Sequence, residues 1–165
     1  MWQGQRVSVV FPAYNEETGI AAAVADFGSL PAVDEVVVVD NNSRDRTASR
    51  AAAAGARVVS ESRQGYGHAL RRGLAEAQGD YVVLAEPDGT FMAKDVLKLL
   101  AYADDFDLVL GTRTTRELIW HGANMGWRLR WGNWIVAKVL QVLFGGPSLS
   151  DCGCTLRLIR RSAAD

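Results

Sequence analysis

Short runs of β-branched residues alternate along the chain with segments of helical spacing. The runs predict strands at 7–11, 35–39, 57–59, 80–85 and 107–110. The segments between them predict helices at 16–27, 43–55, 67–77 and 95–102, followed by a helix at 128–144 and a last strand at 155–159. Strands and helices in this order predict an α/β fold with a mostly parallel sheet that is covered by helices on both faces.

Polar side chains follow the predicted strands. The segments directly after the first five strands are 12–16, 40–43, 64–68, 86–88 and 111–113. In open sheets of this kind, ligands bind outside the carboxyl ends of the strands. The sequence therefore predicts a binding site at that edge of the sheet.

The composition and charge of the chain limit the kinds of binding partner and the location that are expected. The chain has 165 residues and a net charge of -1, so one domain is expected, with no overall field that attracts nucleic acid. Cys152 and Cys154 would point to opposite faces of a strand, which indicates two reduced thiols rather than a disulfide. No signal peptide is visible, so a cytoplasmic location is expected.

The segment from Leu118 onward is rich in tryptophan and arginine. Four of the five tryptophans lie there, and the longest apolar stretch, 134–144, is interrupted by Lys138 and Gln141. This stretch is shorter than the roughly 20 residues that span a bilayer. A helix at 128–144 would either lie in a membrane interface, as a peripheral association with the cytoplasmic face, or pack on the sheet as a core helix.

Acids and glycines at the strand ends suggest chemistry, although each motif alone has a simpler interpretation. Glu86 and Asp88 could ligate a divalent cation or could be solvated acids of a turn. Asp40 could hold a base or ribose hydroxyl or belong to a helix cap. Gly65 and Gly67 resemble a dinucleotide fingerprint only weakly, because the third glycine is missing.

The order of the motifs is more specific than any one of them. The chain carries P-A-Y-N-E at 12–16, V-V-V-D-N-N-S at 37–43, Q-G-Y-G-H-A at 64–69, E-P-D at 86–88, G-T-R at 111–113 and S-D-C-G-C-T-L-R at 150–157. Together they resemble family 2 glycosyltransferases of the GT-A, Rossmann-like fold. Within that family they are most similar to dolichol- or polyprenyl-phosphate mannosyltransferases.

The resemblance implies roles for individual residues. The nucleotide sugar would be held by Pro12, Ala13, Tyr14, Glu16, Asp40, Asn42, Gln64, Gly65, Glu86 and Asp88. Mg²⁺ or Mn²⁺ would bind at Glu86 and Asp88, and Glu86 stands where the family usually has Asp. The acceptor phosphate would face Arg113, Arg128 and Ser150. The catalytic residues would be Asp88, Arg113 and, for a hydroxyl acceptor, Asp151 as the base.

The expected activity is inverting transfer of a sugar from a GDP-mannose or UDP-glucose type of donor to a polyprenyl or dolichyl phosphate. A hydroxyl acceptor and a non-catalytic nucleotide-binding subunit remain alternatives. The chain is expected to be a single catalytic domain, with donor binding in 1–113 and the acceptor side in 114–165. Related proteins usually continue further, so truncation at the C-terminus stays open, as do a homo-oligomer and a separate membrane subunit.

Overall fold

The computed structural model describes residues 1–112, 127–145 and 153–163. Contacts between residues divide the chain into two compact units. The first comprises Met1–Val109 and Leu156–Asp165, and the second comprises Leu110–Thr155. The final segment thus groups with the first unit, whereas the expected acceptor part began at residue 114 and ran to the end. The two functional parts expected from the sequence remain a prediction.

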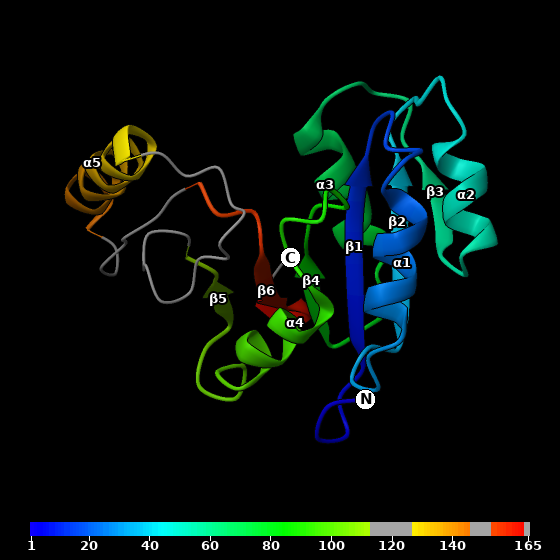
Figure 1. Ribbon diagram of the computed structural model, residues 1–165. Coiled ribbons are helices and arrows are strands. Elements are labelled where there is room, and N and C mark those ends of the chain that lie inside the picture. Colours follow the sequence, from blue (N-terminus) through cyan, green and yellow to red (C-terminus); the bar gives the residue numbers. More distant parts are fainter. Residues whose placement is uncertain (113–126, 146–152, 164–165) are drawn as a thin grey trace. The chain divides into compact units, whose positions relative to one another are not determined.

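The first unit is built on a six-stranded sheet with the order β3-β2-β1-β4-β6-β5 (Figure 1). The pairs β1–β2, β2–β3 and β1–β4 are parallel, and β4–β6 is antiparallel. The α/β class with a mostly parallel sheet is therefore confirmed. The strands are β1 (Val7–Ala13), β2 (Glu35–Asp40), β3 (Arg57–Ser60), β4 (Tyr81–Leu84), β5 (Leu108–Leu110) and β6 (Arg157–Arg160).

Helices cover both faces of this sheet. On one face Val10 of β1 packs with residues of β2, β4 and α3, including Ala69. On the other face Phe11 meets Phe27 of α1 edge to face, with ring centroids 5.1 Å apart. Alternate side chains of β1 thus serve opposite layers, as the pleat requires. The helices of this unit are α1 (Ile20–Gly28), α2 (Thr47–Ala53), α3 (Tyr66–Glu76), α4 (Ala93–Leu100) and the 3₁₀ turn Arg161–Ala163.

Several element boundaries beside the site differ from the sequence prediction, and two of them, the end of β1 and the start of α1, have a clear physical reason. Strand β1 does not stop at Pro12 but continues to Ala13, because only β2 flanks its last residues and β4 ends its pairing at Val10. A strand tolerates proline where no partner needs its missing N–H. Helix α1 begins at Ile20 rather than at Glu16, because Asn15 has a left-handed backbone (φ 56°) and the chain from Asn15 to Gly19 forms a turn.

The second unit contains helix α5 (Trp127–Phe144), which the sequence predicted at 128–144. Lys138 donates a 2.9 Å hydrogen bond to Gln141, and its ammonium lies 6.0 Å from the centre of the Trp134 ring. These three side chains therefore share one side of the helix. None of the helices in the described part of the chain is long and apolar enough to cross a membrane.

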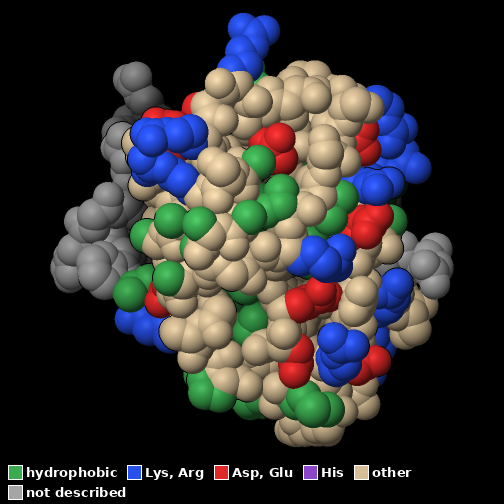
Figure 2. Space-filling model, turned by 90° about the vertical axis from the view of Figure 1, so that its right-hand side faces the viewer, with side chains coloured by type: hydrophobic (Ala, Val, Ile, Leu, Met, Phe, Trp, Pro, Cys, Tyr) green, Lys and Arg blue, Asp and Glu red, His purple; other side chains and the backbone are tan. Residues whose placement is uncertain are grey.

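Charged side chains on the surface of the first unit are arranged in pairs of opposite sign. Arg57 lies 3.1 Å from Glu35 and 3.4 Å from Glu76, and Arg46 lies 3.5 Å from Glu17. Figure 2 shows one face of the molecule, on which basic and acidic side chains are interspersed. Acidic and basic side chains thus balance each other within local groups, as they nearly do over the whole chain, whose formal charge is -1.

Candidate functional site

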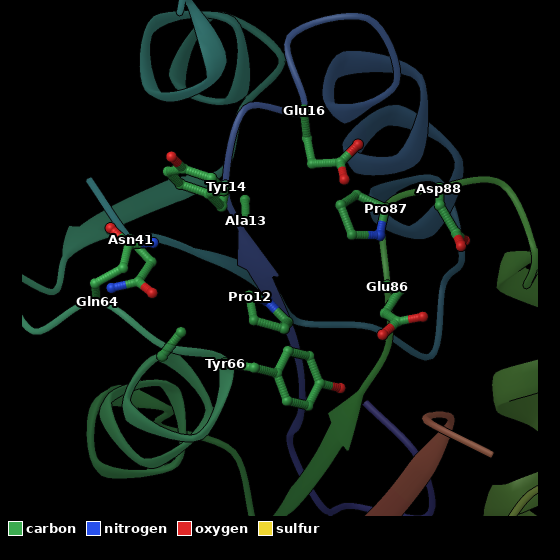
Figure 3. A pocket seen from close by; sticks show the side chains of 11 residues that line it. Pro12, Ala13, Tyr14, Glu16, Asn41, Gln64, Tyr66, Glu86, Pro87 and Asp88 are labelled. Atoms are coloured by element: carbon green, nitrogen blue, oxygen red, sulfur yellow. The ribbon is translucent and has the colours of Figure 1, made fainter. Parts of the chain in front are cut away.

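A cleft of about 400 Å³ opens at the carboxyl ends of β1, β2 and β4 (Figure 3). This is the edge of the sheet at which the sequence predicted a binding site. Glu86 and Asp88 follow β4 on one side of the cleft, and Asn41 and Gln64 lie on the other. The lining consists of Pro12, Ala13, Tyr14, Glu16, Asn41, Gln64, Tyr66, Ala69, Glu86, Pro87 and Asp88.

The turn after β1 is held by the turn after β2. The backbone N–H of Asn15 donates a 3.0 Å hydrogen bond to the hydroxyl of Ser43. The backbone N–H of Glu16 donates a 2.8 Å bond to the hydroxyl of Thr47. If a helix began here, its first N–H groups would have no partner within the helix. The two bonds satisfy these N–H groups, and they fix the direction in which Tyr14 and Glu16 enter the cleft.

The turn after β2 is in turn joined to the loop between β3 and α3. The side-chain amide of Asn41 donates to the carbonyl oxygens of Glu61 (2.9 Å) and Arg63 (2.7 Å). Its oxygen accepts a 2.7 Å bond from the backbone N–H of Gly65. Three consecutive strand-end loops are thus connected side by side at one edge of the sheet.

The charge in the cleft is negative. Partial burial raises the pKa of Glu16, and the charges of Asp88, Asp45 and Glu86 raise it further. Among the described residues that line the cleft, none is Lys, Arg or His. Clustered carboxylates of this kind fit a hard divalent cation, for which carboxylate oxygens are the preferred ligands.

The described residues do not form a closed metal cage. Within 1–112, 127–145 and 153–163, no group of three His, Cys, Asp or Glu side chains is arranged to hold an ion. Magnesium normally keeps waters and takes its remaining oxygens from one or two carboxylates and substrate phosphates. Glu86 and Asp88 therefore fit an ion that is shared with a phosphorylated ligand.

Tyr66 brings a phenol to the same cleft from the first turn of α3. Burial raises the pKa of Tyr66, and so does the neighbouring Glu86 carboxylate, whereas the charge of Arg157 lowers it. Arg157 is the first residue of β6 and pairs with Leu84 in the strand register. The strand β6 thus adds a cation near the end of β4.

Seven of the predicted donor residues line the cleft together: Pro12, Ala13, Tyr14, Glu16, Gln64, Glu86 and Asp88. Asp40, Asn42 and Gly65 do not. Asp40 instead accepts a 3.3 Å hydrogen bond from the backbone N–H of Ser43, and Asn41 takes the place in the cleft. The roles of all these residues remain predictions, whereas their positions are given by the fold.

Sequence reasoning missed Asn41, Tyr66, Ala69 and Pro87 as lining residues. Pro87 and Tyr66 could have been found, because both lie inside motifs that the sequence singled out. Asn41 was overlooked because Asp40 beside it carries a charge. Ala69 carries no polar group, and only the packing of α3 against the sheet brings it to the cleft.

The residues expected on the acceptor side lie outside the described part of the structure. Arg113, Ser150 and Asp151 are not described, and Arg128 lies on α5 without a described side chain. Cys152 is also outside, while Cys154 is buried. The acceptor site and its base therefore remain predictions from the sequence.

The sheet topology, the helices on both faces and the acidic cleft at the strand ends define a GT-A-like α/β protein. A family model confirms the class: the chain belongs to glycosyl transferase family 2, whose model matches residues 8–165.

Similar proteins carry glycosyltransferase names. An uncharacterized glycosyltransferase of Mycobacterium tuberculosis is 42% identical over 135 residues, which cover 77% of this chain and 61% of that protein. A low-salt glycan biosynthesis hexosyltransferase of Haloferax volcanii is 33% identical over 163 residues, covering 95% of this chain and 39% of the relative. The chain thus spans no more than about three fifths of the length of these two relatives.

Several similar solved structures were determined with ligands. Glucosyl-3-phosphoglycerate synthase from Mycobacterium tuberculosis, solved with Mn²⁺, UDP and glucosyl-3-phosphoglycerate, matches with a TM-score of 0.72 and 30% identity. The match covers 96% of this chain and 58% of that protein. The same enzyme has been solved with Mg²⁺ and UDP. The narrower resemblance to dolichol- or polyprenyl-phosphate mannosyltransferases is not supported by these relatives.

Proposed function

We propose that this chain is the donor-binding part of a metal-dependent glycosyltransferase that takes a nucleoside diphosphate sugar, with UDP-glucose as the foremost candidate. The proposal rests on the charge of the cleft: three carboxylates line it, and none of its described lining residues is cationic. A divalent cation bound to these carboxylates would offset their repulsion of a donor diphosphate. Glu86 and Asp88 offer the oxygens that such a cation prefers.

Different residues of the cleft would bind different parts of the donor. Tyr14 and Gln64 are grouped away from the acids and would contact the nucleoside (Figure 3). Asp88, with Glu86 beside it, would hold Mg²⁺ or Mn²⁺ against the diphosphate. The ion supplies Lewis-acid stabilisation of the charge that develops on the leaving nucleoside diphosphate. The acceptor would then attack the anomeric carbon from the opposite side, with inversion.

For the acceptor we propose a hydroxyl of a small phosphorylated metabolite. The similar synthase structures with phosphoglyceric acid support this choice over a lipid phosphate. A hydroxyl must lose a proton during attack, so a general base is needed. Asp151 is the proposed base, and Arg113, Arg128 and Ser150 are the proposed contacts of the acceptor phosphate.

A polyprenyl phosphate acceptor is the second candidate, because of one feature of α5. The exposed side chains of this helix include Trp131, Trp134, Ile135, Val139 and Leu143. An apolar helix face with tryptophan suits the interface of a membrane. A phosphate acceptor is already ionised and would need no base.

The test begins with a thermal-shift panel of UDP-glucose, GDP-mannose and dTDP-glucose, each with and without Mn²⁺. A shift of several degrees is expected for one donor, and only with the metal, through linkage between binding and unfolding. Asp88→Ala should lose the shift, while Asp104→Ala, an exposed acid outside the cleft, should keep it. Equal shifts with and without metal, or an unaffected Asp88→Ala, would refute the proposal.

Product analysis then separates the acceptors. The protein is incubated with the identified donor and either 3-phosphoglycerate or polyprenyl phosphate, and the glycosylated product is detected by mass spectrometry. Transfer to phosphoglycerate supports the main proposal, and transfer to the lipid supports the second. Donor binding without any release of sugar would indicate the non-catalytic subunit.

A further inference from the structure

Two adjacent asparagines tie the turn after β2 to the loop that precedes α3. Asn42 donates a 2.7 Å hydrogen bond to the carbonyl oxygen of Ser62, next to the three bonds of Asn41. The two side chains thus engage the backbone of four of the five residues in 61–65. We call these bonds the asparagine tether. It spans about twenty residues of sequence and is made of side-chain contacts to backbone groups.

Asn41 is the central member of the tether. Its side chain is 3% exposed, and both hydrogens of its amide are donated to carbonyl oxygens. The amide oxygen accepts from Gly65, so the orientation of the group is fixed by the loop itself. A buried amide that is satisfied in this way rigidifies the groups it joins.

The tethered loop supplies one wall of the cleft. Gln64 and Tyr66 line the cleft, and Gly65 between them has φ 138°, a conformation that side chains other than glycine rarely adopt. Gly65 also begins the first turn of α3 through its carbonyl, which accepts from His68 at 3.0 Å. The bond from the N–H of Gly65 to Asn41 therefore fixes both the position of this wall of the cleft and the start of α3.

We propose that Asn41 is a positioning residue for the donor: through its bonds to the loop 61–65 it holds Gln64 and Tyr66 where the nucleoside of the donor must contact them. The inference rests on the proposed function, because it assigns this wall to a nucleotide. Pre-ordering a loop lowers the cost of ordering it on binding, and that saving appears as affinity. The bonds of the tether do not involve the acids of the cleft, although Tyr66, which the tether helps to place, lies beside Glu86.

Asn41→Ala removes all three bonds at once. The loop would then sample other conformations before the donor binds, and part of the binding energy would be used to order it. We expect Kd and KM for the donor to rise about tenfold, the equivalent of one net hydrogen bond to an ordered group. We expect kcat to change less than KM, because the acid pair keeps its place. Asn41→Asp keeps the acceptor for Gly65 but places a buried carboxylate oxygen against two carbonyl oxygens, so a loss at least as large as that of Asn41→Ala is expected.

Ser8→Ala is the matched control for a loss of stability alone. Ser8 is buried and polar, and its hydroxyl accepts a 2.7 Å bond from the backbone N–H of Gly79 at the opposite edge of the sheet. Removing it leaves the N–H of Gly79 and a carboxylate oxygen of Glu35 without this partner, just as Asn41→Ala leaves the N–H of Gly65 without its own. Because Ser8 does not line the cleft, its substitution should leave Kd and KM unchanged.

The experiment pairs hydrogen exchange of the ligand-free protein with donor titration. Amide exchange of the peptide covering 61–66 is measured by mass spectrometry for wild type, Asn41→Ala and Ser8→Ala. The Kd of UDP-glucose or GDP-mannose with Mn²⁺ is measured on the same samples. The proposal expects faster exchange in 61–66 and weaker donor binding for Asn41→Ala only.

Each outcome decides the proposal. Unchanged exchange in Asn41→Ala would show that the tether does not order the loop, and faster exchange with unchanged Kd would show that the loop does not serve the donor. An equal loss of affinity in Ser8→Ala would reduce the role of Asn41 to general stability. If wild type binds neither nucleotide, the proposed function fails and the assignment of this wall to a donor fails with it, whatever the exchange shows.

Discussion

The backbone N–H of Glu16 donates a hydrogen bond of 2.8 Å to the side-chain hydroxyl of Thr47. Thr47 is fully buried, and its own backbone N–H donates a 3.0 Å bond to Asp45. One buried threonine thus joins the first loop of the cleft to the start of α2. A residue that lines the cleft is thus held in place by a residue outside its lining.

Thr47→Val should therefore destabilise the protein although the two side chains have nearly the same shape. The substitution leaves the N–H of Glu16 without its partner at a partly buried position, a loss of about 1–3 kcal/mol in the free energy of unfolding. Urea unfolding measures it. Ser49→Ala, an exposed hydroxyl of the same helix, should change stability by less than about 0.5 kcal/mol. Equal effects of the two substitutions would contradict the prediction.

The two acids of the cleft should differ in their effect on metal dependence. Asp88→Asn removes the proposed main ligand and should lower kcat/KM on the order of 100-fold, with a higher Mn²⁺ concentration needed for half-maximal donor binding. Glu86→Gln should have the smaller effect on the Mn²⁺ requirement, since Glu86 also lies beside Tyr66. Isothermal titration at several Mn²⁺ concentrations measures both. A larger Mn²⁺ effect in Glu86→Gln would reverse the assignment.

Low pH should reduce the contribution that the loop 61–65, which carries the tether, makes to the stability of the protein. Hydrogen bonds from the side chain and backbone of Arg63 lower the pKa of Glu61 to about 2 from its ordinary 4.5. Between those values the unfolded chain binds more protons than the folded one, so stability falls as the pH decreases from about 4.5 to about 2. Above about 4.5 the contribution of Glu61 is fully present.

Glu61→Gln should lose less stability than wild type over that pH window, because its side chain does not titrate. Urea unfolding at pH 6 and pH 3 gives the comparison. Asp104→Asn serves as the exposed control and should follow the wild-type pH dependence. A parallel decline of wild type and Glu61→Gln would show that the pair with Arg63 does not link folding to protons.

Two glycines of α3 should respond in opposite directions to alanine. A Cβ on Gly73 would collide with Val10 of β1 and lie 3.2 Å from Val39, so Gly73→Ala should cost about 1–3 kcal/mol by overpacking. Gly67 has open space around it, and Gly67→Ala should stabilise by up to about 1 kcal/mol through helix propensity. Urea unfolding of both variants measures the difference. A stabilised Gly73→Ala would mean that α3 can move away from the sheet.

Much of the fold could be predicted because burial on both faces of a parallel sheet leaves a local signal. The run Glu35–Asp40 was expected at 35–39, and the strands at 7–11 and 80–85 were recovered with shifted ends. The predicted end of β1 at residue 11 was wrong, because proline is excluded from a strand only where a neighbouring strand needs the N–H that proline lacks. That condition depends on how far β4 runs alongside, which the sequence near Pro12 does not contain.

The sequence by itself determined the alternation of strands and helices, the acids after β4 and the polar residues at the other strand ends, because each is a local pattern. Only the tertiary structure decided that β6 lies antiparallel beside β4 and that Asn41 rather than Asp40 enters the cleft. Neighbouring side chains at a strand end point to opposite sides, so a shift of the strand register by one residue would decide which of the two enters the cleft. Register is set by pairing across the sheet, between segments that are distant in the sequence.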